Sequence, residues 1–226
     1  MGAIRYEKYA ITIVLPLRKI PVGYESLSCG LRFTFTGCYQ LFLEWYNFCM
    51  KYVALIRGIN VGGNSIVKMA DLKVAMEKTG FANVSTYINS GNVLFESSEK
   101  NTLAIEKTVE DVLAKQFKVP VKVVVRTDTE MSHTLKEVPH AWKSKDFRCY
   151  IAFIKNPMTP QEVASGLLPK EGVDFVALGP GAVYMATKME GITKTGFTKV
   201  AGTKIYPYMT MRNLNTLTKL VALLSK

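Results

Sequence analysis

Two periodicities of hydrophobic residues divide the stretch from about residue 51 to 127 into strands and helices. Continuous or alternating apolar residues predict strands, whereas apolar residues that recur every three to four positions predict amphipathic helices. In chain order the pattern predicts a strand at 51–56, a helix at 68–80, strands at 84–88 and 93–95, a helix at 105–117 and a strand at 121–125. This β-α-β-β-α-β order is the split βαβ or ferredoxin-like arrangement.

The second half of the chain has a less regular pattern. Thr127 and Glu130 have the spacing of a capping box, which predicts a helix up to about Leu135. Further elements are predicted as a strand at 149–154, a short helix at 160–168, a hairpin of strands at 173–178 and 182–187, and a terminal helix with Thr210 as N-cap and with Leu214, Leu217, Val221 and Leu224 on its apolar face. No strict internal repeat is visible. The fold class is therefore α+β, a ferredoxin-like unit followed by a second, smaller α/β unit and a C-terminal helix.

The first 49 residues differ from the rest in composition. They hold three of the four cysteines and an aromatic cluster at 39–48, without a clear succession of strand and helix periods. We expect residues 1–49 to be an atypical N-terminal extension, either from a misplaced start codon or as an accessory element of the sheet. The remaining units are expected at 50–137 and 138–226.

Charge is unevenly distributed along the chain. The formal net charge is +11, from 29 Lys and Arg against 18 Asp and Glu, and residues 188–226 carry seven basic residues and one acidic residue, Glu190. Such a bias favours a polyanionic or phosphate-bearing partner, although a solubilising surface has the same appearance.

Cysteine and histidine usage gives little sign of metal or redox chemistry. Cys29, Cys38, Cys49 and Cys149 have neither zinc-site spacing nor the density of a disulfide scaffold, so we expect a reducing, cytoplasmic location. Cys149 is expected to be an inert core thiol. With two histidines, His133 and His140, no metal site and no cofactor are predicted.

Other surface and membrane features also argue against specialised chemistry. The apolar stretch Tyr9–Leu17 is far shorter than a bilayer span, so no membrane association is expected. The adjacent carboxylates Glu110 and Asp111 point to different faces of a helix and are expected to be solvated.

A glycine-rich loop joins the first strand to the first helix and is the strongest candidate for a binding site. The loop runs Arg57-Gly58-Ile59-Asn60-Val61-Gly62-Gly63-Asn64-Ser65. Its unshielded backbone amides next to a helix N-terminus are suited to an anion. The segment is one residue from a P-loop, but Asn64 replaces the lysine that would contact the β and γ phosphates, which disfavours nucleotide hydrolysis. A purely structural glycine turn is the alternative.

Two further polar segments are candidates for the same ligand. The first segment, Asn89-Ser90-Gly91-Asn92, is typical of a hairpin turn. If this turn lay near the glycine loop, a polar ligand would be recognised jointly by Asn60, Asn89, Ser90 and Asn92. In a ferredoxin-like sheet we expect these two loops at different ends or edges.

The terminal segment offers Arg212, Asn213 and Asn215, with Arg212 suited to bidentate binding of phosphate or carboxylate. The alternative is that Arg212 and Asn215 anchor the last helix through buried hydrogen bonds. An anchoring role predicts a lower melting temperature for Arg212→Ala, whereas a ligand role leaves folding intact.

Three segments together resemble the bacterial DUF1697 family of uncharacterised proteins. They are Leu55–Asn64 (LIRGINVGGN), Thr86–Val93 (TYINSGNV) and Thr210–Thr216 (TMRNLNT), and the resemblance covers residues 50–226. Leu214 departs from the family pattern, which usually has Trp there. The resemblance implies an α/β fold but no established activity.

Three classes of function follow. The first is a nucleic-acid-binding module that would use Tyr87 and Phe95 of the sheet for base stacking. The second is a protein that binds a small phosphorylated or carboxylated ligand at the glycine loop, with or without catalysis. The third is a structural or assembly protein with no ligand. The glycine loop and Arg212 favour the second; oligomeric state is not indicated by the sequence.

Overall fold

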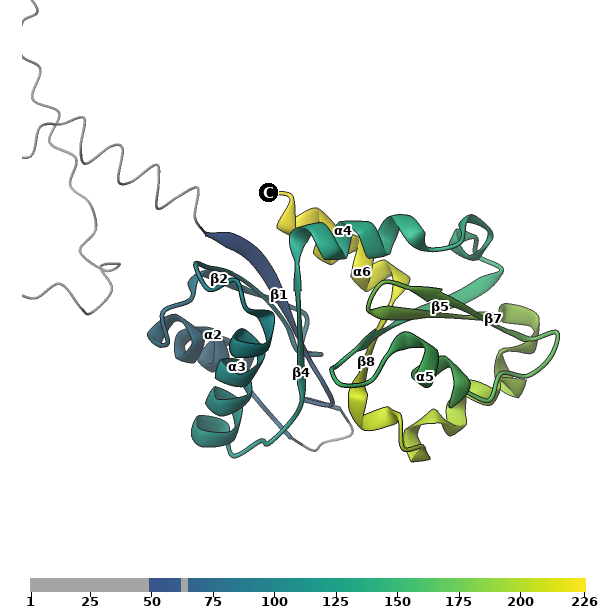
Figure 1. Cartoon of the computed structure of the whole chain (residues 1–226), viewed down its shortest axis with the longest axis horizontal. Helices are drawn as coiled ribbons and strands as arrows, with labels where there is room; N and C mark the ends of the chain where they lie inside the picture. Colours follow the sequence, from purple (N-terminus) through teal and green to yellow (C-terminus); the bar gives the residue numbers. More distant parts are fainter. Residues whose placement is uncertain (1–48, 62–64) are drawn as a thin grey trace, which may run out of the picture.

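The computed structural model describes residues 49–61 and 65–226, which form a mixed α+β protein with two four-stranded antiparallel sheets (Figure 1). The predicted extension at 1–49 therefore falls outside the described residues except for Cys49. The first half contains β1 (Met50–Ile56), α2 (Met69–Lys78), β2 (Ala82–Tyr87), β3 (Asn92–Ser97), α3 (Thr102–Phe117), β4 (Val123–Thr127) and α4 (Asp128–Glu137). The predicted β-α-β-β-α-β order of elements is confirmed.

The second half has its own sheet. Between its third and fourth strands it has several 3₁₀ turns, where the first half has the long helix α3. Its elements are η1 (His140–Lys143), β5 (Phe147–Ile154), α5 (Pro160–Ser165), β6 (Asp174–Gly179), β7 (Ala182–Lys188), η2 (Met189–Lys194), η3 (Gly196–Gly202), η4 (Tyr206–Tyr208), β8 (Met209–Asn213) and α6 (Leu214–Leu224). The predicted strands, the hairpin and the short helix of this half are all present.

The two halves repeat one strand order, although the sequence shows no repeat. The first sheet is ordered β2-β3-β1-β4 and the second β6-β7-β5-β8, which is the same order when the strands of each half are counted from its start. In both halves a helix follows the fourth strand, α4 in the first and α6 in the second, and these two helices contact each other.

Three layers of hydrophobic residues hold the sheets and helices together. One core lies between the first sheet and the helices α2 and α3, which cover its outer face (Figure 1). A second core combines side chains from both sheets with α4 and α6, and a third packs the other face of the second sheet against α5 and the 3₁₀ turns. Strand β1 contributes Tyr52, Ala54 and Ile56 to the first core and Val53 and Leu55 to the second, so its uninterrupted apolar sequence reflects burial on both faces.

Helix starts follow the capping signals only in part. The capping box of Thr127 and Glu130 is confirmed at the start of α4. The predicted cap at Thr210 is wrong, because Thr210 lies in β8 and Asn213 is the N-cap of α6, accepting a hydrogen bond from the amide of Thr216 at 2.7 Å. Arg212 is accordingly a strand residue.

The edge strand β4 is covered by carboxylates of α3. Glu106 accepts a hydrogen bond from the amide of Val125 at 3.0 Å, and Glu110 accepts one from the amide of Val123 at 2.9 Å. Lys155, from the second half, pairs with both carboxylates. The expectation that Glu110 is solvated is therefore wrong; the carboxylate satisfies backbone groups that a sheet edge would otherwise leave open.

Within the described residues, no helix has the length and apolar character needed to cross a membrane.

Candidate functional site

The glycine-rich loop and the β2–β3 turn lie at the same end of the first sheet. Strand β1 runs antiparallel to β3 with Leu55 opposite Asn92, so the end of β1 meets the start of β3. Asn60 joins the two loops, because its Nδ2 donates to the carbonyls of Val67 and Asn89, each at 2.9 Å, while its Oδ1 accepts from the amide of Val67 at 2.8 Å. The expectation that the loops lie at different ends is wrong.

Arg212 reaches this junction from β8 and is buried, with 8% of its surface exposed. Its Nη2 donates to the carbonyls of Ile56 at 2.9 Å and of Ser90 and Gly91 at 3.1 Å, and its Nε donates to Oδ1 of Asn92. Its Nη1 donates to the hydroxyl of Thr210 and the carbonyl of Met211. Burial lowers the pKa of Arg212 to about 10, so the guanidinium is still cationic at neutral pH. The contacts of Arg212 agree with the anchoring alternative, since all three nitrogens are bound within the protein, whereas Asn215 is exposed and makes no hydrogen bond among the described residues.

The turn around Gly91 has no room for a side chain. Gly91 has a φ of +81°, and a Cβ at this position would lie 3.0 Å from both Cβ and the carbonyl oxygen of Ile56. A glycine is therefore required both by the backbone conformation and by the approach of the turn to β1.

The other predicted residues of the loop are only partly described. Gly62, Gly63 and Asn64 lie outside the described residues, so the anion pocket predicted there stays a prediction. Gly58 is exposed with a φ of +66°. Arg57 places its guanidinium over the ring of Tyr206, 4.3 Å from the centroid, and its buried Nε has no hydrogen-bond partner among the described residues.

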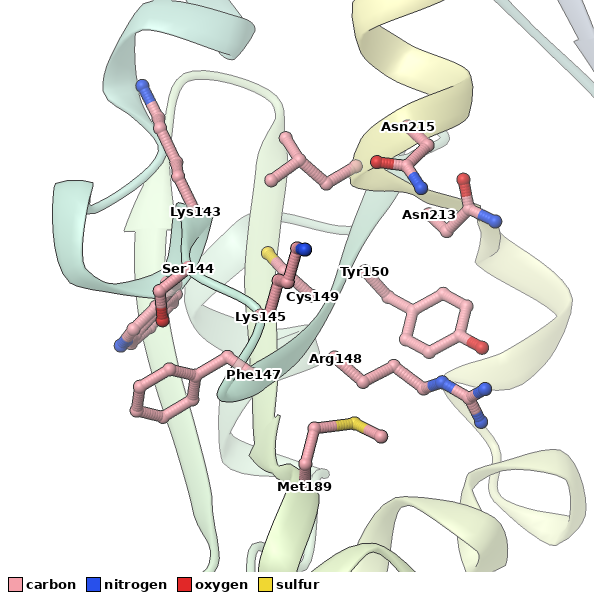
Figure 2. A pocket seen from close by; sticks show the side chains of 12 residues that line it. Lys143, Ser144, Lys145, Phe147, Arg148, Cys149, Tyr150, Met189, Asn213 and Asn215 are labelled. Atoms are coloured by element: carbon pink, nitrogen blue, oxygen red, sulfur yellow. The ribbon is translucent and has the colours of Figure 1, made fainter.

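Asn213 and Asn215 lie at a different place, in a cavity of about 350 Å³ beside the start of α6 (Figure 2). The structure thus brings Asn60, Asn89, Ser90, Asn92 and Arg212 together but separates them from these two asparagines. The cavity is lined by Trp142, Lys143, Ser144, Lys145, Phe147, Arg148, Cys149, Tyr150, Met189, Asn213, Leu214 and Asn215.

The cavity arises because β8 is shorter than its neighbour β5. The ladder between these strands ends where Tyr150 lies opposite Asn213, whereas β5 begins three residues earlier, at Phe147. From Phe147 to Cys149 the strand is paired with β7 on one side only. The chain turns into α6 at this point, so the helix start, the uncovered end of β5 and the segment after η1 enclose the cavity.

The side chains around the cavity give it a positive charge. Lys143, Lys145 and Arg148 are exposed, and in the part of the chain that the structure describes none of them forms an ion pair. The first turn of α6 contains no acidic residue. Because α6 also directs the positive end of its dipole toward the cavity, the arrangement is suited to a negatively charged ligand.

Cys149 contributes no nucleophile to this cavity. Burial raises the pKa of its thiol to about 11, against a smaller opposing effect of Lys143, so the thiol is protonated at neutral pH. No group of three or more metal-binding side chains occurs among residues 49–61 and 65–226.

Sequence reasoning missed the basic side of the cavity. The run Lys143-Ser144-Lys145-Asp146-Phe147-Arg148 carries three cations within six residues, but it falls at the boundary between the predicted units. Its local charge density was a usable signal, whereas the shortness of β8 was not visible from sequence.

The aromatic residues considered for base stacking are not on an open sheet face. Phe95 is 2% exposed and lies between Tyr52 and Phe81, with ring centroids 5.7 and 4.6 Å away. Tyr87 is half-buried against the second core. Both faces of the first sheet are covered, which removes the specific basis for stacking at these two residues.

The chain belongs to the family described as "Protein of unknown function (DUF1697)", whose model matches residues 50–184. Two of the three segments quoted above lie in this range, and Thr210–Thr216 follows it. Among solved structures the chain is similar to the conserved bacterial protein SP0830 from Streptococcus pneumoniae, with a TM-score of 0.69 and 26% identity over 78% of this chain and 99% of that one. No curated protein matches the chain.

Proposed function

We propose that this protein binds a small anionic ligand, phosphorylated or carboxylated, in the cavity between η1, β5 and α6. The observation that carries the proposal is the placement of Lys143, Lys145 and Arg148 around one cavity without carboxylate partners among the described residues. Uncompensated cations raise the local concentration of anions, and a guanidinium binds phosphate or carboxylate with two parallel hydrogen bonds.

The start of the related helix α4 supports this interpretation by contrast. In α4, Asp128 and Glu130 lie in the first turn, and Glu130 accepts a hydrogen bond from the amide of Thr127 at 2.7 Å. That helix therefore has an internal anion at its positive end. Helix α6 follows the fourth strand in the same way but has none in its first turn, so an external anion is the natural complement.

Several finer predictions remain part of the proposal. The glycine loop at 57–65 is kept as the alternative location for the ligand. We also propose that the first sheet with α2 and α3 is a ferredoxin-like unit, which the order β2-β3-β1-β4 supports. The proposed units remain 50–137 and 138–226, preceded by an extension at 1–49.

The test is a titration of the full chain with inorganic phosphate and ribose 5-phosphate at low ionic strength, followed by calorimetry. The triple variant Lys143→Ala/Lys145→Ala/Arg148→Ala is expected to bind at least tenfold more weakly, because a hydrogen bond to a charged group contributes about 1.5–3 kcal/mol. A control variant with three cations removed from α3 and its end, Lys107→Ala/Lys115→Ala/Lys118→Ala, has the same net charge and is expected to bind like the wild type. Equal losses in both triple variants would mean that net charge alone attracts the anion, and the proposed site would be rejected.

A further inference from the structure

The cationic cavity also has aromatic and apolar walls, which restrict the chemistry of its ligand. Trp142 and Tyr150 are both half-buried, but Trp142 and Leu214 pack against the second core and Tyr150 against the third, so they line different sides of the cavity; Phe147 and Met189 complete the apolar lining. The positions of Trp142 and Phe147 are supported from behind by Phe175, whose ring centroid lies 6.4 Å from that of Trp142 and 5.7 Å from that of Phe147. A small inorganic anion would not contact these aromatic side chains, whereas a planar group attached to the anion would pack against them.

Polar groups for recognition of a heteroaromatic edge lie on the other side of the same cavity. The carboxamide of Asn215 and the hydroxyl of Tyr150 make no hydrogen bond to any described residue, and Asn213 uses only its Oδ1, as the cap of α6. Figure 2 shows Tyr150 and Arg148 extending in the same direction from β5, with Asn213 and Asn215 above Tyr150 at the start of α6. A carboxamide offers one donor and one acceptor side by side, which is the pattern that pairs with a nucleobase edge.

We infer that the ligand of this cavity is a nucleoside monophosphate unit, with its base against Trp142 and Phe147 and its phosphate at Lys145, which lies between Lys143 and Arg148 (Figure 2). The inference rests on the proposed function and specifies its substrate class. A cavity of about 350 Å³ is at the small end of the range for ligand sites, which favours one nucleotide over a longer ligand inside it. The same unit is present in a free mononucleotide and at the 5′-phosphorylated end of a nucleic acid.

The experiment compares ligands that differ by one part. The full chain is titrated with the four ribonucleoside 5′-monophosphates, ribose 5-phosphate, adenosine and a 5′-phosphorylated dinucleotide. At least one monophosphate is expected to bind about tenfold more tightly than ribose 5-phosphate, because stacking of a base on an aromatic ring is worth roughly five- to 150-fold in affinity. Asn215→Ala and Trp142→Leu should each weaken the binding of this monophosphate by a larger factor than the binding of ribose 5-phosphate, and so remove most of the advantage.

A matched control is Tyr208→Leu, which replaces an exposed aromatic residue outside the cavity and should preserve the nucleotide advantage. If Trp142→Leu does not fold, Asn215→Ala alone tests base recognition. This variant should fold, because Asn215 is exposed and makes no internal hydrogen bond among the described residues.

The outcomes separate the two proposals. Equal binding of every monophosphate and ribose 5-phosphate would overturn the nucleotide inference and leave the anion site intact. Failure of all phosphorylated compounds to bind would overturn the nucleotide inference and, with it, a phosphorylated ligand for the anion site. Tight binding by the mononucleotide alone would identify a free nucleotide, and equal binding of the dinucleotide would identify a nucleic acid end; both results support the inferred unit.

Discussion

The two halves of this protein are connected by two similar sets of hydrogen bonds, each from an arginine of one half to backbone carbonyls of the other. Arg126 of β4 donates to the carbonyls of Ile154 at 2.7 Å and Gly181 at 3.1 Å, which are the end of β5 and the β6–β7 turn. Arg212 of β8 donates to the corresponding groups of the first half, the end of β1 and the β2–β3 turn. The fourth strand of each half therefore carries an arginine that is hydrogen-bonded to the other half. These paired contacts explain why an arginine is needed near the end of β4 and of β8.

The difference between the halves is the basis for the proposed position of the ligand. The first half has a complete second helix, α3, and a helix α4 whose positive end is neutralised by its own carboxylates. The second half replaces α3 by 3₁₀ turns, and its α6 begins beside three cations and a cavity. We interpret the start of α4 as internally satisfied and the start of α6, with the three cations beside it, as the proposed position of an external anion.

The largest expected effect concerns Arg212, the more extensively bound of the two arginines. Arg212→Ala removes the donor for four backbone carbonyls and for the side chains of Asn92 and Thr210, and is expected to destabilise the protein by about 3–5 kcal/mol. The melting temperature should fall by roughly 10 °C in thermal unfolding followed by circular dichroism. Arg212→Lys should recover only part of this loss, since one ammonium group cannot replace the planar fork. An unchanged melting temperature for Arg212→Ala would argue for a ligand role instead.

Arg126→Ala should have a smaller effect of the same kind. Its guanidinium contacts three carbonyls, those of Val125, Ile154 and Gly181, and no side-chain acceptor among the described residues. We expect a loss of about 2 kcal/mol in urea unfolding. If Arg126→Ala proved as damaging as Arg212→Ala, the connection would be symmetric in energy as well as in position.

Acid should weaken the second half through Asp174, which fixes the 3₁₀ region that stands in place of α3. Burial alone would raise the pKa of Asp174, but hydrogen bonds from the amides of Lys170 and Gly196 and from Thr195 and Thr187 together hold it below its ordinary value of 3.8. Because the folded-state pKa is depressed, this stabilisation is fully present above pH 4 and is lost as the pH falls through the lowered value.

Asp174→Asn tests this acid dependence. The variant should be destabilised by about 1–3 kcal/mol at neutral pH, and its unfolding free energy should change less between pH 4 and pH 2 than that of the wild type. Urea unfolding at a series of pH values measures both quantities. Parallel pH profiles of the two proteins would show that other carboxylates govern the acid dependence.

Much of the fold could be predicted from sequence because local signals were strong. The continuous apolar run of β1, the helical spacing of α3 and the capping box of α4 each specify an element without reference to the rest of the chain. Strand β8 was missed because five residues with two polar side chains and an arginine resemble the start of a helix, and only pairing with β5 makes them a strand.

The candidate site was less accessible to sequence reasoning, because it depends on contacts between distant segments. Arg212 and Asn92 lie 120 positions apart, and their hydrogen bond follows from the packing of the two sheets. Likewise, the cavity depends on the relative lengths of β5 and β8, which no local pattern records.

The most direct test of the account is a backbone-amide NMR titration of the full chain with ribose 5-phosphate. We predict that the largest saturable shifts occur together at residues 142–150 and 213–216, and that they are lost in the Lys143→Ala/Lys145→Ala/Arg148→Ala variant. Saturable shifts confined to the amides at 57–67 and 88–92 would place the ligand at the glycine loop and would contradict the proposed cavity.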